Sequence, residues 1–277
     1  MVAGACSTKA TTGADPVKRI NQAIETLDWP AAQAALDVIG NDGFEVCSAT
    51  EADWDSYVES ADQRVNPRFL EYRNNAIYLI EMGGGLHGDI VAGISEAMLV
   101  ATSPEATGTN ARVLRLYHET HINKSSRRAI GGLPKLEPDC CCGPASHIGA
   151  IKPAHLRWNE FHTFKVEVGV SQGWRSMDVK VARYCAFPGI RYVLCVIVSP
   201  DMSVREYKLF AITNDELEGP APDLVPPTPI TAATRIVLDG RRLLALPNNT
   251  ALPGRFPAEV SFTLQPILDA ASIHDTE

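Results

Sequence analysis

The sequence predicts a mixed α/β fold built around one sheet. Three observations favour this class. Apolar residues follow helical spacing over 86–100. A continuous apolar run over 192–198 indicates a central buried strand, and residues 164–170 and 204–212 are typical of further strands. Helices interleaved with strands in this order indicate an α/β or α+β fold with a mixed sheet.

Length and composition set broad limits. The chain has 277 residues, 45% of them hydrophobic and 21% charged, so it can bury a core without disulfides. Its net charge of −8 argues against coating nucleic acid by bulk charge, but it allows a local basic patch. Seven cysteines without an apolar leader indicate free thiols in a reducing compartment. We therefore expect an intracellular protein, cytoplasmic or nuclear, that is neither secreted nor embedded in a membrane.

The first part of the chain divides into a polar start and a helical segment. Residues 1–15 are small and polar, and we expect them to be disordered. Apolar spacing predicts a helix over 17–27, and flanking proline and glycine predict a second over 31–39. No period is evident over 41–66, so residues 16–66 are interpreted as a helical N-terminal elaboration.

Residues 67–215 contain the elements of the expected core. Asn74-Asn75 between two strand-like runs predicts a tight hairpin, and Pro188-Gly189 ends a helix that begins near Trp174. The other expected elements are the helix 86–100, the strands 112–117, 164–170, 192–198 and 204–212, an exposed basic loop over 121–135, and a loop of cysteines and glycine after Pro138-Asp139. The segment 216–277 begins with a proline-rich loop, and it continues with a strand near 235–238 and a helix near 262–271. We expect this C-terminal elaboration to pack on the core.

Three separated elements carry the candidate catalytic residues. His87 starts a helix, Asp139 follows a proline, and Glu167 lies in a strand that is followed by Gln172 and Lys180. An Asp at one strand end and a Glu on the next strand can meet at one sheet edge, where two carboxylates suit Mg²⁺ or Mn²⁺. Glu167 stands in an otherwise apolar strand, which is costly without a partner or a metal. A nearby lysine could steady an attacking water or a developing phosphate charge.

The order of these residues resembles the Uma-type family of restriction-endonuclease-like proteins, in the PD-(D/E)XK nuclease superfamily. The similarity runs from about Phe69 to Ile212, which is about half of the chain. The matching positions are, in order, Glu71-Tyr72, Asn75, His87, Pro138-Asp139, Glu167-Val168, Ser171, Lys180, Tyr184, Gly189 and Tyr192. The run Glu-Val-Gly-Val-Ser-Gln-Gly-Trp is similar to the version found in fungal members.

The resemblance implies an αβββαβ core and a metal-dependent endonuclease acting on DNA. Asp139 and Glu167 match the metal-binding acids, and the main-chain carbonyl of Val168 would be a further ligand. Lys180 matches a helix-borne lysine that replaces the lysine of the E-x-K motif. Gly169 stands where that lysine would be, and three cysteines directly follow the aspartate, so this sequence departs from the usual motif.

Two further residues, His87 and Gln172, are expected to position the substrate. Each also has a structural interpretation, because the histidine could only supply hydrogen bonds at a helix start and the glutamine could cap the next helix. Glu71 and Glu81 are weaker candidates. Between Ala111 and Trp158 there are eight basic residues and three acids, which favours DNA as a partner. A homodimer stays open.

Other interpretations also stay open. The fold could serve without catalysis as a module that binds nucleic acid or protein, because fold does not fix function and the E-x-K lysine is missing. Asp139 could be only a turn residue, and Glu167 could be an edge-strand acid paired with Lys165 or Arg183. The run Cys140-Cys141-Cys142 lacks the spacing of zinc sites, so we expect free thiols in a loop.

Overall fold

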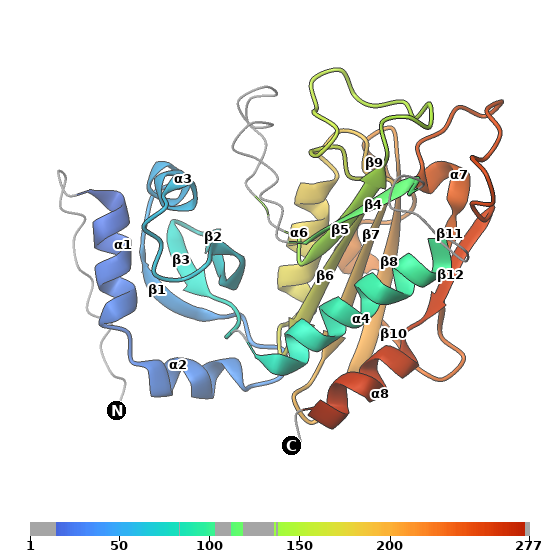
Figure 1. Ribbon diagram of the computed structural model, residues 1–277. Helices are drawn as coiled ribbons and strands as arrows, with labels where there is room; N and C mark the ends of the chain where they lie inside the picture. Colours follow the sequence, from blue (N-terminus) through green and yellow to red (C-terminus); the bar gives the residue numbers. More distant parts are fainter. Residues whose placement is uncertain (1–14, 83, 103–111, 119–135, 137, 275–277) are drawn as a thin grey trace.

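A computed structural model of the chain describes residues 15–82, 84–102, 112–118, 136 and 138–274. Within these ranges lie a three-stranded sheet, a seven-stranded mixed sheet and a two-stranded ribbon, with helices packed around them (Figure 1). The predicted α/β class with a mixed sheet is confirmed. The expectations for the polar start and for the basic loop fall on residues 1–14 and 119–135, which lie outside the described part.

The N-terminal unit is an antiparallel sheet in the order β1-β3-β2, accompanied by three helices. Sequence periodicity misses β1 because a bulge between Glu45 and Cys47 breaks the alternation of buried and exposed side chains. The helix after it begins with a capping box formed by Thr50 and Asp53. The elements are α1 (Pro16–Glu25), α2 (Trp29–Leu36), β1 (Phe44–Ser48), α3 (Glu51–Glu59), the 3-10 turn Pro67–Phe69, β2 (Leu70–Arg73) and β3 (Ala76–Leu79).

The predicted hairpin is confirmed, and it belongs to this N-terminal sheet. Asn74 and Asn75 both adopt positive φ angles, 49° and 58°, as a two-residue type I′ turn requires. Asparagine tolerates this conformation better than most residues. The strand β3 lies between β2 and β1, and its Ile77 and Leu79 pack in one cluster with the N-terminal helices.

The seven-stranded sheet has the order β10-β8-β7-β6-β5-β4, with β9 paired to β8. β6 and β7 run parallel, and the other pairs are antiparallel. The strands are β4 (Leu114–His118), β5 (Cys140–Pro144), β6 (Phe164–Val170), β7 (Tyr192–Val198), β8 (Arg205–Thr213), β9 (Glu216–Leu217) and β10 (Thr228–Pro229). The helix α6 (Trp174–Tyr184) joins β6 to β7 and packs on one face, while α4 (Gly85–Thr102) crosses the other face (Figure 1).

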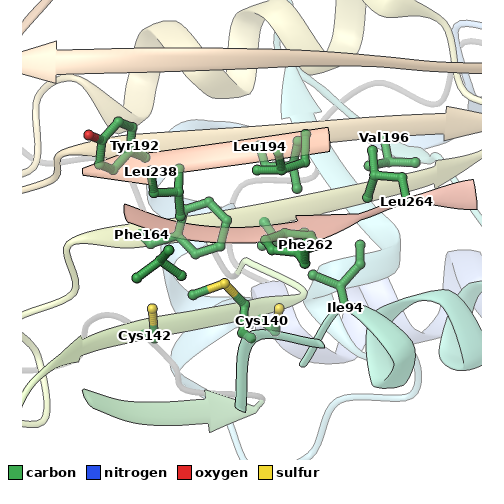
Figure 2. Close-up of a cluster of buried hydrophobic side chains, with 14 of the residues drawn as sticks. Ile94, Cys140, Cys142, Phe164, Tyr192, Leu194, Val196, Leu238, Phe262 and Leu264 are labelled. Carbon is green, nitrogen blue, oxygen red and sulfur yellow. The ribbon is translucent and has the colours of Figure 1, made fainter. Parts of the chain in front are cut away.

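The expected loop of cysteines and glycine is wrong, because these residues form β5. The strand is hydrogen-bonded on both sides, to β4 and β6, and every residue in it is buried. A strand buried on both faces shows no alternation, and this one has no β-branched residues to reveal it. Cys140 and Cys142 point into the core cluster beside Ile94 and Phe164 (Figure 2). All three cysteines are free thiols.

The C-terminal segment covers the same face of the sheet as α4. Its elements are the 3-10 turn Pro222–Leu224, β11 (Arg235–Asp239), α7 (Gly240–Leu243), β12 (Glu259–Thr263) and α8 (Gln265–His274). Leu238, Phe262 and Leu264 pack in one cluster with Leu194 and Val196 of β7 (Figure 2). The helix expected near 262–271 begins later, at Gln265, because residues 259–263 form β12. None of the helices in the described ranges is both long and apolar enough to cross a membrane.

His162, in the loop before β6, should make the free energy of unfolding depend on pH. Its Nε2 contacts the carbonyl of Asn159 at 3.1 Å, and its buried Nδ1 has no hydrogen-bond partner in the described part of the chain. Burial and the nearby Lys165 ammonium hold the pKa of His162 well below its usual range. Below about pH 6.5 the unfolded chain therefore binds a proton that the folded chain does not, and folding loses stability.

We expect the free energy of unfolding to fall between pH 7 and pH 5.5, by up to about 1.4 kcal/mol per pH unit from this residue. The His162→Phe variant should lack that component. Urea denaturation at both pH values measures it, with His155→Gln, at an exposed position, as the control. Equal acid sensitivity in His162→Phe and the wild type would contradict this assignment.

Candidate active site

Asp139 is anchored to β6 by two main-chain contacts. The N–H of Val168 donates to Oδ2 of Asp139 at 2.7 Å. The N–H of Asp139 donates to the carbonyl of Val166 at 3.1 Å. Asp139 immediately precedes β5, so the pairing of β5 with β6 brings its carboxylate beside the middle of β6. It is therefore more than an isolated turn residue.

Glu167 lies on the opposite face of β6 from its apolar neighbours. Val166 and Val168 join the cluster under α4, whereas Glu167 is 1% exposed and faces α6. Nζ of Lys180 donates to its Oε2 at 2.8 Å, and the hydroxyl of Tyr184 donates to its Oε1. These two partners stand four residues apart on α6, so they share one helix face. The alternative that Glu167 is an edge-strand acid paired with Lys165 or Arg183 is wrong. β6 is an inner strand, and the cation that pairs with Glu167 is Lys180.

His87 lies between two carboxylates. Its Nδ1 is 2.7 Å from Oε1 of Glu81, and its Nε2 is 3.2 Å from Oδ1 of Asp139. The second contact has ion-pair distance without hydrogen-bond geometry. Nε2 of Gln172 donates to the other oxygen of Glu81 at 3.0 Å, and Oε1 of Gln172 is buried without a hydrogen-bond partner among the described residues. A continuous row of polar groups thus leads from Gln172 through Glu81 and His87 to Asp139.

The site is strongly polarised. Burial alone would lower the pKa of His87, but the carboxylates of Asp139 and Glu81 raise it to about 10, so this imidazole is cationic at neutral pH. Burial would raise the pKa of Asp139, but the positive charges of His87 and Lys180 hold it below its usual range. Burial raises the pKa of Glu167, and Lys180 only partly opposes this rise. The aspartate is therefore the more readily ionised acid, and a cation flanks each carboxylate.

The structure brings together every residue expected in the site. Gln172, His87 and Asp139 are linked through Glu81, and Lys180 is paired with Glu167. The two groups meet at β6, where Asp139 accepts from the N–H of Val168, next to Glu167. Gln172 does not cap the following helix, because the N-cap of α6 is Gly173, which makes no side-chain cap bond.

Sequence reasoning underrated Glu81 and gave Tyr184 no role. Glu81 closes the apolar run of β3, and an acid in that position is buried. An acid at the end of an apolar run was the signal in the sequence, but the sequence does not show which residues pair with this acid. Tyr184 follows Lys180 at helical spacing, which was the corresponding signal for the second partner of Glu167.

The donor atoms present are of the kind that a divalent cation prefers. Among the described residues, no three His, Cys, Asp or Glu side chains form a metal-binding group. Mg²⁺ is nevertheless commonly held by one or two carboxylates, with water and substrate phosphate completing the coordination. Asp139, Glu167 and the carbonyl of Val168 offer such hard oxygen donors, so the donor chemistry fits. Lys180 and His87 supply the positive charge beside these acids in the metal-free protein.

No protein-family model and no curated protein matches this chain. Its function is therefore inferred from the placement and the chemistry of these side chains.

The buried Glu167–Lys180 pair can be tested by stability. Lys180→Met leaves a buried carboxylate without its cation, and we expect a loss of about 3 kcal/mol in the free energy of unfolding. Adding Glu167→Gln to this variant should recover most of the loss, because no unpaired charge then remains. Urea denaturation in EDTA measures both variants, and Lys18→Met on the exposed side of α1 is the control. A Lys180→Met protein as stable as the wild type, or a double variant no better than the single one, would refute the pairing.

Proposed function

We propose that the protein is a metal-dependent phosphodiesterase of the PD-(D/E)XK type that hydrolyses DNA as an endonuclease. The observation that carries the proposal is the convergence of Asp139, Glu167 and Lys180 from three separate elements. Two carboxylates and a lysine at the junction of β5, β6 and α6 have the composition that phosphodiester hydrolysis needs.

The order of elements supports this proposal. In the described part of the chain, the helix α4 is followed by β4, β5, β6, α6 and β7, which is the αβββαβ order that the resemblance implies. The acids stand on β6 and just before β5, and the lysine stands on the helix after β6, as that resemblance also implies.

Gly169, where the lysine of an E-x-K motif would stand, packs closely against two side chains. A Cβ atom at Gly169 would lie 2.6 Å from Cε of Met177 and 3.0 Å from Cβ of Gln172. A lysine at that position would therefore have to displace the end of the Met177 side chain. Lys180 reaches Glu167 from α6 instead, so the missing motif residue has a replacement at the same carboxylate.

Each polar residue has a distinct task in the proposed reaction. Asp139, Glu167 and the carbonyl of Val168 would hold a divalent cation, which would supply Lewis-acid charge to offset the negative phosphodiester. Lys180 places a second positive charge where charge develops in the transition state. Tyr184 holds the Glu167 carboxylate in one orientation, and His87 orients the Asp139 carboxylate. Gln172 would position the substrate, since its buried Oε1 still lacks a partner among the described residues.

A second candidate function is a nuclease fold that binds nucleic acid or protein without cleaving it. One observation favours it: both oxygens of Glu167 already accept hydrogen bonds, from Lys180 and Tyr184. A cation binding there has to share these oxygens with the two donors.

The cleavage assay separates the two functions. With plasmid and single-stranded DNA in Mg²⁺ or Mn²⁺, we expect cleavage by the wild type and a loss of at least about 100-fold in Asp139→Asn and Glu167→Gln. Glu259→Gln removes an exposed carboxylate on β12 and should cleave normally. Because all the variants are purified in the same way, cleavage that is lost only in the site variants cannot come from a contaminating nuclease. Undiminished cleavage by the two site variants would exclude this site, and DNA binding without cleavage by the wild type would favour the non-catalytic function.

A further inference from the structure

A pocket of about 530 Å³ lies between the β2–β3 hairpin and α6. Three arginines line it, Arg73 from the hairpin and Arg175 and Arg183 from the helix. Two tyrosines, Tyr72 and Tyr78, and two acids, Asp42 and Glu71, also line it, so the arginines outnumber the acids by one. We propose that this arginine pocket binds the phosphodiester backbone of a single DNA strand beside the proposed active site. The inference deepens the proposed function and rests on it for the identity of the strand.

The three guanidinium groups have donors to spare. Arg73 lies 3.4 Å from the buried Glu71 carboxylate, and Arg175 is 3.7 Å from Asp42 with a side chain that is 78% exposed. Arg183 donates to the carbonyl of Tyr72 over 3.4 Å. Each guanidinium has five N–H donors, and none of these contacts is a short bidentate pair. A guanidinium group with free donors binds a phosphate through two parallel hydrogen bonds to two of the phosphate oxygens.

The aromatic lining fits a single strand. The guanidinium of Arg73 stacks over the ring of Tyr78 at 4.2 Å from its centroid, and Tyr72 lies on the same hairpin. Proteins that hold single strands combine a positive groove with aromatic rings on which bases stack. The volume of the pocket is that of a small-ligand site, which matches a short stretch of one strand better than the side of a duplex.

The arginine pocket shares part of its wall with a second cavity that Lys180 lines. A smaller cavity of about 40 Å³ shares Glu71, Tyr72 and Arg183 with the arginine pocket and is also lined by Lys180 and Tyr184. These last two residues are the partners of Glu167. A strand in the arginine pocket would therefore lie beside a cavity that is lined by the lysine of the site.

The two walls of the pocket are fixed to each other. Oγ of Ser176 on α6 donates to Glu71 of the hairpin at 3.0 Å. Nδ2 of Asn41 donates to the carbonyl of Ser171 at 2.9 Å, and the N–H of Gly173 donates to the carbonyl of Asn41 at 3.2 Å. These contacts join the hairpin and the segment before β1 to α6 and to the loop that precedes it, so the two walls of the pocket are held together.

Binding of a fluorescent single-stranded oligonucleotide, followed by anisotropy in EDTA, tests the inference without cleavage. We expect Arg175→Gln/Arg183→Gln to weaken binding at least about 10-fold and to reduce the slope of log K against log salt by about 1.4, as two lost phosphate contacts require. The matched control, Arg235→Gln/Arg255→Gln, removes the same charge from the C-terminal segment and should change binding less than about twofold. Arg175→Glu, at an exposed position, should weaken binding without affecting thermal unfolding.

Wild-type-like binding by the pocket variants, equal weakening by the control, or no binding by the wild type would each overturn the inference. Its failure is distinct from that of the proposed function. If DNA binding depends on the pocket arginines but the protein does not cleave DNA, the arginine pocket is supported and the hydrolase is excluded. If the protein cleaves DNA but its DNA binding does not depend on these arginines, the hydrolase is supported and the arginine pocket is excluded.

Discussion

Burial of the Glu167 carboxylate is the constraint on which the rest of the structure depends. A charge inside the sheet costs several kcal/mol unless it is paired and hydrogen-bonded. Only α6 supplies suitable partners among the described residues, through Lys180 and Tyr184. The helix must therefore lie across β6 with one face turned inward, and its return to β7 makes those two strands parallel.

The other charges of the site extend this constraint to distant parts of the chain. Asp139 is held by the main chain of β6, and His87 from α4 stands beside it. Glu81, which follows the hairpin, binds both His87 and Gln172. The N-terminal sheet, the long helix and the central sheet thus meet at one group of polar side chains. A structural charge network and a metal-dependent site share this architecture, because both need acids kept close together and away from bulk water.

Local patterns allowed much of the fold to be predicted. The hairpin, α4, β6 and β7 follow from turn residues and apolar periods, which depend only on neighbouring residues. β1 and β5 were not predicted. The bulge in β1 interrupts its pattern, and burial of β5 on both faces removes the alternation of buried and exposed residues. The candidate site was predicted as a set of residue types in order. The contact of Glu81 with Gln172 and the arginine pocket could not be predicted, because they arise where the hairpin and the residues after it meet elements about 100 residues later in the chain.

The central claim is that Asp139 and Glu167 form a metal centre rather than a purely structural ion-pair network. Mn²⁺ binding, followed by calorimetry on the metal-free protein, tests it most directly. The claim predicts binding that is lost in both Asp139→Asn and Glu167→Gln and kept in Glu259→Gln, with all three variants folded. Absence of Mn²⁺ binding by the wild type, or binding that survives in both site variants, would contradict it.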